Sequence, residues 1–209
     1  GNVFVLGPTF DTTAKRLVSY AKRAGKDKIV VLHANDIGGQ LERNAIQRAI
    51  SANGATLSGD IEYALSQESV RAAVPRVKAT IESSGANALF MTANSATALP
   101  LLAEMLPAAG VRNATSQFVG MTRWDIPAQT LAIPGIQGGW FALPDPSATA
   151  AFAARYNAAY GARPLDIAGL AFDGVAAIGS LVKSGRANAL TGSALTQNAG
   201  FRGANGIFR

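Results

Sequence analysis

The chain has 209 residues, of which 48% are hydrophobic and 15% are charged, and its formal net charge is +6. This composition is that of an ordinary globular protein and excludes a disordered tail, and no apolar run approaches the ~20 residues that a membrane-spanning helix needs. The sequence contains no cysteine, which excludes disulfides, thiolate metal sites and cysteine nucleophiles.

The predicted elements alternate between short strands and helices. Strands are expected in runs that are rich in β-branched and other apolar residues, and these runs cover 3–6, 28–33, 55–65, 88–92, 117–121 and 135–143. Helical patterns lie between them. Because parallel strands need helical crossovers that cover both faces of their sheet, the alternation predicts an α/β fold with a doubly wound parallel sheet.

The first predicted helix and the turn after it are basic. They contain Lys15, Arg16, Lys22, Arg23, Lys26 and Lys28. Such a face can bind nucleic acid or an acidic lipid surface. Since Tyr20 is the only aromatic residue there that could stack on a base, we expect a solvated helix face and no nucleic acid partner.

Apolar spacing predicts two further helices. In 38–53, one stripe contains Leu41, Ala45, Ile46, Ala49 and Ile50, and the opposite side carries Glu42, Arg43, Gln47 and Arg48. In 70–84, Pro75 interrupts the stripe, and an interior proline costs about 3 kcal/mol, so this helix is expected to begin near Arg71. Glycines that fit helix C-caps follow three helices, at Gly54, Gly85 and Gly110.

Residues 144–195 contain helical patterns and no convincing strand. The segment 167–182 is apolar nearly all the way round, as expected for a helix that a large partner buries.

Three predicted strands end in loops that are candidates for a binding site: "HANDIGG" at 33–39, "TANSAT" at 92–97 and "MTRWDIP" at 121–127. Ligands of open parallel sheets bind at the carboxyl ends of the strands, where polar side chains and free backbone N–H groups can hold an anion or a polar group. The alternative is that Asp36, Ser95 and Asp125 merely cap helices.

The residue patterns do not support catalysis. The glycine spacing of a dinucleotide or triphosphate loop is absent. His33 is the only histidine and has no partners for a triad or metal site, so a structural or rim position is expected. Among the acids, only Asp60 and Glu62 share a strand face. No catalytic residue, cofactor or metal is therefore expected.

Arg123 and Trp124 form the most distinctive pair. A guanidinium and an indole in a loop at the strand ends could bind a carboxylate or a flat ring. In the alternative interpretation, Trp124 covers the edge of the sheet and Arg123 lies in solvent.

Taken together, these segments resemble a known family. The resemblance runs from "GPTFDTTAKRLVSYAKRAGKDKIVVLHANDIGG" through "GANALFMTANSATALPLLAEMLPAAGV" to "GFRGANGIFR". The family is the type I periplasmic binding proteins, in which two α/β lobes, joined by three chain crossings, clamp a ligand between them. The leucine/isoleucine/valine-binding proteins and their penicillin-binding protein activator subgroup are the most similar branch.

The resemblance implies a domain organisation. A hinge crossing is expected near 7–12, and 1–143 would form the second lobe. Residues 144–195 would be helices of a largely absent first lobe, and 196–209 would return towards the hinge. The chain is thus expected to be a fragment of a larger protein with a signal peptide upstream.

The resemblance also implies ligand contacts. Ile37 stands where relatives often have an aromatic residue, next to Gly38, and further contacts are expected at Asn94, Ser95, Arg123, Trp124 and, from the other lobe, Asp173. Amino-acid binders place a carboxylate where this chain has Arg123. Since a cation there would repel an ammonium group, an anionic or aromatic ligand is expected instead of a branched-chain amino acid.

The function implied by the resemblance is that of a periplasmic solute-binding component of an ABC transporter, free or lipid-anchored, which binds a small molecule and a permease without catalysis. The alternative is a regulatory protein of the activator type, which would act on a cell-wall synthase through an outer surface such as the basic helix 13–28. An enzyme that uses the same sheet edge is a third, less favoured class.

Overall fold

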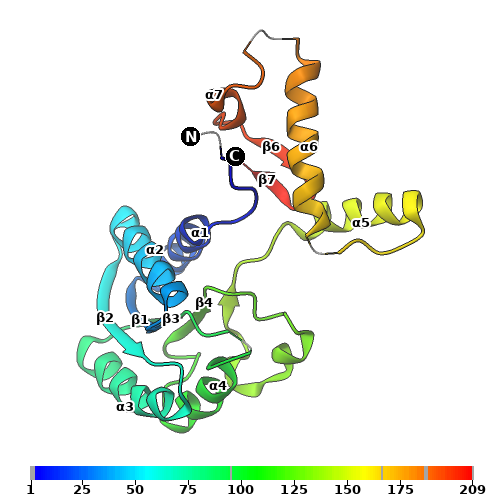
Figure 1. Ribbon diagram of the computed structural model, residues 1–209. Helices are drawn as coiled ribbons and strands as arrows, with labels where there is room; N and C mark the ends of the chain where they lie inside the picture. The colour runs from blue at the N-terminus through cyan, green and yellow to red at the C-terminus, as the bar shows by residue number, and fades with distance from the viewer. Residues whose placement is uncertain (1–2, 95, 166, 186–187, 209) are drawn as a thin grey trace. The chain divides into compact units, whose positions relative to one another are not determined.

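The computed structural model describes residues 3–94, 96–165, 167–185 and 188–208, and the chain divides into two compact units (Figure 1). One unit covers 8–142, and the other combines 1–7 with 143–209. That this second unit belongs to a separate lobe of a larger protein stays a prediction.

The unit 8–142 contains a five-stranded sheet with helices on both faces. Its strands, in the order β2-β1-β3-β4-β5, are all parallel, which confirms the predicted fold class (Figure 1). The elements in chain order are α1 (Phe10–Arg23), β1 (Lys28–Ala34), α2 (Ile37–Asn53), β2 (Thr56–Tyr63), α3 (Gln67–Ser84), β3 (Ala88–Met91), α4 (Leu99–Ala108), β4 (Gln117–Gly120), the 3-10 turns η1 (Ala128–Ala132) and η2 (Pro134–Ile136), and β5 (Trp140–Phe141).

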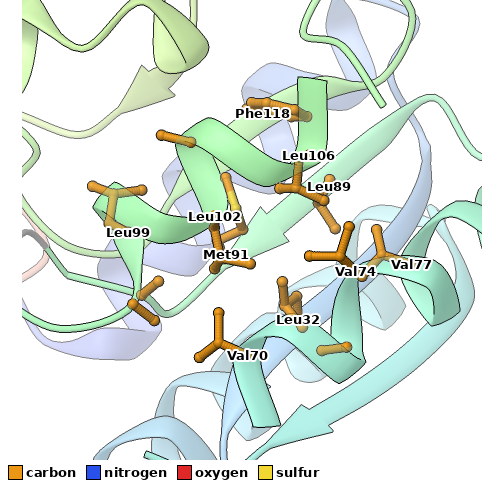
Figure 2. Close-up of a cluster of buried hydrophobic side chains, with 14 of the residues drawn as sticks. Leu32, Val70, Val74, Val77, Leu89, Met91, Leu99, Leu102, Leu106 and Phe118 are labelled. Atoms are coloured by element: carbon orange, nitrogen blue, oxygen red, sulfur yellow. The ribbon is translucent and has the colours of Figure 1, made fainter. Parts of the chain in front are cut away.

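The sheet is buried on both sides because successive side chains of a strand point to opposite faces. Ile29 and Val31 of β1 pack with α1 and α2, whereas Val30 and Leu32 pack with α3 and α4. Figure 2 shows the second of these clusters, where Leu32 lies close to Val70 of α3. The faces of the sheet are therefore not accessible to a ligand.

Two of the strand predictions were wrong. Residues 3–6 form no strand, and Val3 and Val5 are exposed. A β-branched run becomes a strand only where another strand pairs with it, and no described residue does so here. The predicted strand 135–143 shortens to β5, because η2 and the positive φ of Gly138 (78°) turn the chain before it.

The start predicted for α3 was also wrong. The helix begins at Gln67, because the Ser66 side chain accepts a hydrogen bond from the backbone N–H of Ser69. Pro75 therefore lies inside the helix, and burial of Val70, Val74 and Val77 on the sheet offsets the missing hydrogen bond. Gly54 and Gly85 are left-handed C-caps as predicted, whereas Gly110 follows the actual C-cap residue, Ala109.

The other unit consists of helices and one hairpin: α5 (Pro146–Tyr160), α6 (Ala168–Lys183), α7 (Gly192–Leu195), β6 (Phe201–Gly203) and β7 (Gly206–Phe208). Asp173 of α6 is buried, and its Oδ1 accepts a hydrogen bond of 2.6 Å from the N–H of Ala204 in the hairpin turn. One face of α6 is exposed and apolar, with Val175, Ile178 and Val182. No helix of the described residues has the length and apolar character needed to cross a membrane.

We predict that Gly120→Ala destabilises the protein. The new methyl group would overlap Cε2 of the Trp124 indole, which lies directly against Gly120. Overpacking of this kind lowers the free energy of unfolding by about 1–3 kcal/mol, which urea denaturation followed by circular dichroism measures. In the control Gly179→Ala, the new methyl group has no neighbour within 4 Å and the helix should gain ~0.5–1 kcal/mol. Equal stabilities of the two variants would contradict the packing described.

Candidate functional site

The three candidate loops lie at one edge of the sheet in the unit 8–142. The parallel register pairs Leu32 of β1 with Met91 of β3, and Met91 with Gly120 of β4. Each strand therefore ends at the same level, and the loops after Ala34, Met91 and Gly120 are neighbours. We call this side of the sheet the carboxyl edge.

The first loop leads from β1 into α2. Oδ1 of Asp36 accepts a hydrogen bond of 2.7 Å from the N–H of Gly39, so Asp36 is the helix cap that the sequence allowed. Gly39 must be glycine, because a Cβ there would overlap the carbonyl oxygen of Ala34. Ile37 is 80% exposed and Gly38 is also exposed, so both are open to a ligand at the carboxyl edge.

The second loop follows β3. Oδ1 of Asn94 accepts hydrogen bonds of 3.0 Å from the N–H of Ala96 and from the hydroxyl of Thr97, which fixes the turn into α4. Asn94 is itself exposed at the carboxyl edge. Ser95, the other predicted contact in this loop, lies outside the described residues.

The third loop carries a bidentate ion pair that the sequence analysis missed. Nε of Arg123 donates to Oδ1 of Asp125 at 2.6 Å, and Nη2 contacts Oδ2. The hydrogen bond from Arg123 lowers the pKa of Asp125. Asp125 therefore neutralises Arg123 and does not cap a helix among the described residues. The sequence did contain a signal for this ion pair, because Arg123 stands two residues before Asp125.

Trp124 lies in the core and is only 1% exposed. Its ring packs against Gly120 and Gly139 and has its centroid 6.2 Å from that of Phe141. This arrangement matches the interpretation in which Trp124 covers the sheet edge. A ligand could reach Ile37, Asn94 and Arg123 without disturbing the core, whereas Trp124 would have to leave it. Asp173 belongs to the other unit, where its carboxylate binds the hairpin turn.

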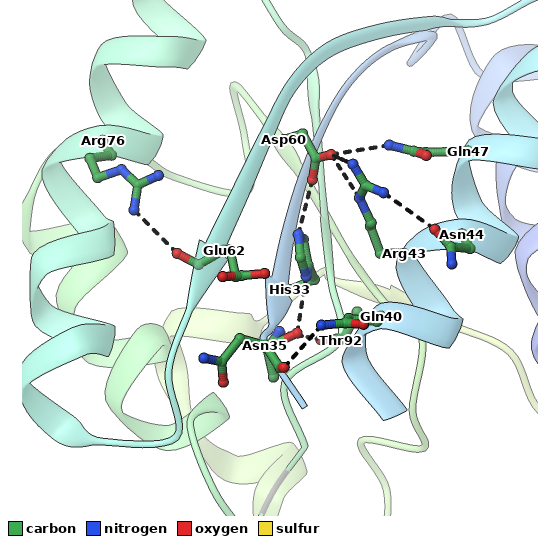
Figure 3. Close-up of polar contacts among 11 residues, drawn as sticks. His33, Asn35, Gln40, Arg43, Asn44, Gln47, Asp60, Glu62, Arg76 and Thr92 are labelled. Atoms are coloured by element: carbon green, nitrogen blue, oxygen red, sulfur yellow. Dashed lines mark hydrogen bonds and ion pairs between the residues drawn. The ribbon is translucent and has the colours of Figure 1, made fainter. Parts of the chain in front are cut away.

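A polar cluster beneath the carboxyl edge explains the single histidine (Figure 3). Nε2 of the buried His33 lies 3.1 Å from Oδ1 of Asp60, and Nδ1 lies 3.0 Å from the carbonyl oxygen of Ala34. Asp60 also accepts hydrogen bonds from Arg43 and Gln47 of α2. Because these groups bind one another, the cluster joins β1, β2 and α2, which agrees with a structural role for His33.

Glu42 is a buried acid near the carboxyl edge. The sequence placed it on the polar side of α2 and Leu41 in the apolar stripe, but Glu42 is 6% exposed and Leu41 50% exposed. The rest of the predicted stripe is buried, and Glu42 shares its side of the helix because it lies three and four residues before Ala45 and Ile46. Oε2 of Glu42 has no hydrogen-bond partner among the described residues. Burial, assisted by the charge of Asp36, raises the pKa of Glu42 to about 7.

Comparisons with known proteins agree with this fold. A family model described as periplasmic binding protein matches residues 1–206. A comparison with curated proteins found no significant match.

Solved structures of several binding proteins are similar to this chain. One is a putative branched-chain amino acid ABC transporter from Rhodospirillum rubrum, with a TM-score of 0.75 and 18% identity over 98% of this chain and 59% of its own. Another is an ABC transporter substrate-binding protein from Desulfitobacterium hafniense in complex with leucine, with a TM-score of 0.68 and 18% identity over 99% and 60% of the two chains. A solute-binding protein from R. palustris in complex with benzoate has a TM-score of 0.59 and 17% identity over 96% and 56%. The chain thus spans little more than half of the length of these proteins.

We predict that Glu42 makes stability fall between weakly acidic and neutral pH. Its carboxyl stays neutral up to a pKa of about 7 in the native state but ionises above 4.5 in the unfolded state. The unfolded state therefore loses its proton first, and the free energy of unfolding decreases by up to about 3 kcal/mol as the pH rises through this interval, then levels off.

Urea denaturation at pH 5 and pH 8 measures this change. Glu42→Gln should remove it and should stabilise the protein at pH 8, while Glu104→Gln, at an exposed acid of α4, should behave like the wild type. The prediction fails if Glu42→Gln keeps the full difference between the two pH values.

Proposed function

The chain belongs to the periplasmic binding protein family, and from that premise we propose that it is a ligand-binding part of a periplasmic solute-binding protein that serves an ABC transporter. The observation that carries the proposal is the carboxyl edge, where Ile37, Asn94 and Arg123 are exposed on three neighbouring loops. The site binds and releases its ligand without chemical change.

The ligand is a small organic carboxylate with an apolar or aromatic body. Ile37 supplies an exposed apolar contact, and the Arg123 side chain remains 40% exposed despite its ion pair with Asp125. A guanidinium has five N–H donors and can bind two carboxylates at once. Leucine and benzoate, the ligands of two similar structures, both carry a carboxylate.

We further propose that the unit formed by 1–7 and 143–209 is part of the other lobe, the one that the sequence analysis called the first lobe. Val175, Ile178 and Val182 form an apolar stripe on α6 that is exposed in this chain, and contiguous apolar surface of this kind normally packs against other protein. The similar structures are longer than this chain. Closure of two lobes by a hinge motion would then enclose the ligand.

The test is a thermal shift panel on the full-length protein with small carboxylates, aromatic and aliphatic, and with their amides. Carboxylates should raise the melting temperature, because a ligand that binds the native state stabilises it. Arg123→Ala should weaken binding about tenfold or more, since charge-assisted hydrogen bonds are lost.

Arg112→Ala is the matched control. Arg112 is exposed and lies before β4, at the opposite edge of the sheet, so this variant should bind as the wild type does. The proposal is refuted if no carboxylate in the panel shifts the melting temperature, or if Arg123→Ala and Arg112→Ala bind equally well.

A further inference from the structure

A pocket lies at the carboxyl edge of the unit 8–142, between the first turns of α3 and α4. Its volume is about 430 Å³, which is in the range of small-molecule sites. Tyr63 and Val70, both buried, line it from the side of β2 and α3, and Ala98 and Leu101 line it from the side of α4. Figure 2 shows Val70 of α3 and Leu102 of α4 in the same cluster of buried side chains. Ile37, Asn94 and Arg123 do not line this pocket.

The charges around the pocket favour an anion. Arg71 lines it and is exposed, and no described residue forms an ion pair or hydrogen bond with its guanidinium. None of the described lining residues is acidic. Burial, with the nearby charges of Asp36 and Glu42, raises the pKa of Tyr63 to about 12, so its phenol stays neutral at physiological pH.

Two helix N-termini also face the pocket, but Ser66 caps α3 and Glu68 lies in its first turn, so Arg71 is the main positive charge there. Both α3, with 18 residues, and α4, with 10, begin at the pocket. The cap residue of α4, Ala98, has no side-chain oxygen, but the N–H of Leu99 donates to the backbone carbonyl oxygen of Asn94 and Pro100 has no N–H.

The remaining wall is apolar. The ring of Tyr63 and the side chains of Val70 and Leu101 can pack against a hydrocarbon or aromatic body, while Arg71 stands where a negative group would extend from it. We propose that this pocket is an accessory binding site for a small organic carboxylate with an apolar body, distinct from the site of Ile37, Asn94 and Arg123. The inference does not depend on the function proposed for that site.

Methyl NMR of the chain, labelled at leucine and valine, tests the site directly. Phenylacetate should shift the methyl signals of Leu65, Val70 and Leu101, which line the pocket. Phenylacetamide, which has the same shape and no charge, should bind at least about tenfold more weakly. Equal affinities for the two compounds would overturn the assignment of Arg71 as the anion contact.

Two variants on α3 separate charge at the pocket from charge in general. Arg71→Gln should weaken phenylacetate binding about tenfold, whereas Arg76→Gln, on the same helix but outside the pocket, should leave it unchanged.

Gln67→Trp should abolish binding by filling the mouth of the pocket, because Gln67 is exposed and lines the pocket. Equal binding by Arg71→Gln and Arg76→Gln, or unchanged binding by Gln67→Trp, would refute the proposal.

Arg123→Ala distinguishes the pocket from the site of Ile37, Asn94 and Arg123. If the pocket is independent, the variant keeps the methyl shifts of Val70 and Leu101 even when it loses binding at that site. Loss of those shifts in Arg123→Ala would show one shared site and would overturn the inference, while leaving the function proposed for the site of Arg123 intact.

Discussion

In a parallel sheet the carboxyl ends of all strands lie at one edge. The parallel pairing of β1 with β2 and β3 gives the unit 8–142 this arrangement. Helices cover both faces of the sheet, so neither face is available to a ligand. The loops after β1, β3 and β4 therefore lie at one edge. Each loop carries backbone N–H groups or charged side chains. Ile37, Asn94 and Arg123 come from distant parts of the sequence, and this pairing places the loops that carry them at the same edge.

The construction of the carboxyl edge demands close contacts and leaves some polar groups unpaired. Gly39 lets α2 approach the end of β1, and Gly120 makes room for the indole of Trp124. Nε1 of Trp124 and Oε2 of Glu42 have no hydrogen-bond partner in the part of the chain that the structure describes. Such atoms cost about 1–3 kcal/mol each. The polar cluster around Asp60 offsets part of this by joining two strands to α2.

Much of this arrangement could be predicted from sequence, because it depends on local patterns. The run 28–33 and the helix 38–53 follow from apolar spacing, and the alternation of elements determines the fold class. The failures have physical causes. Residues 3–6 look like a strand but have no described partner. Glu42 was placed on the polar side of α2 by its residue type, but it lies on the same buried side as Ala45 and Ile46. The position of Trp124 depends on Gly139, a tertiary contact that no local pattern contains.

Amide hydrogen exchange of the full-length protein, with and without the carboxylate that binds it best, is the most direct test of the carboxyl edge as the ligand site. The account predicts slower exchange at 34–39, 92–94 and 121–125 when ligand is bound. The turns at the opposite edge, 24–27 and 85–87, should exchange at unchanged rates. Protection confined to that opposite edge, or no protection in any of the three loops at saturating ligand, would contradict the account.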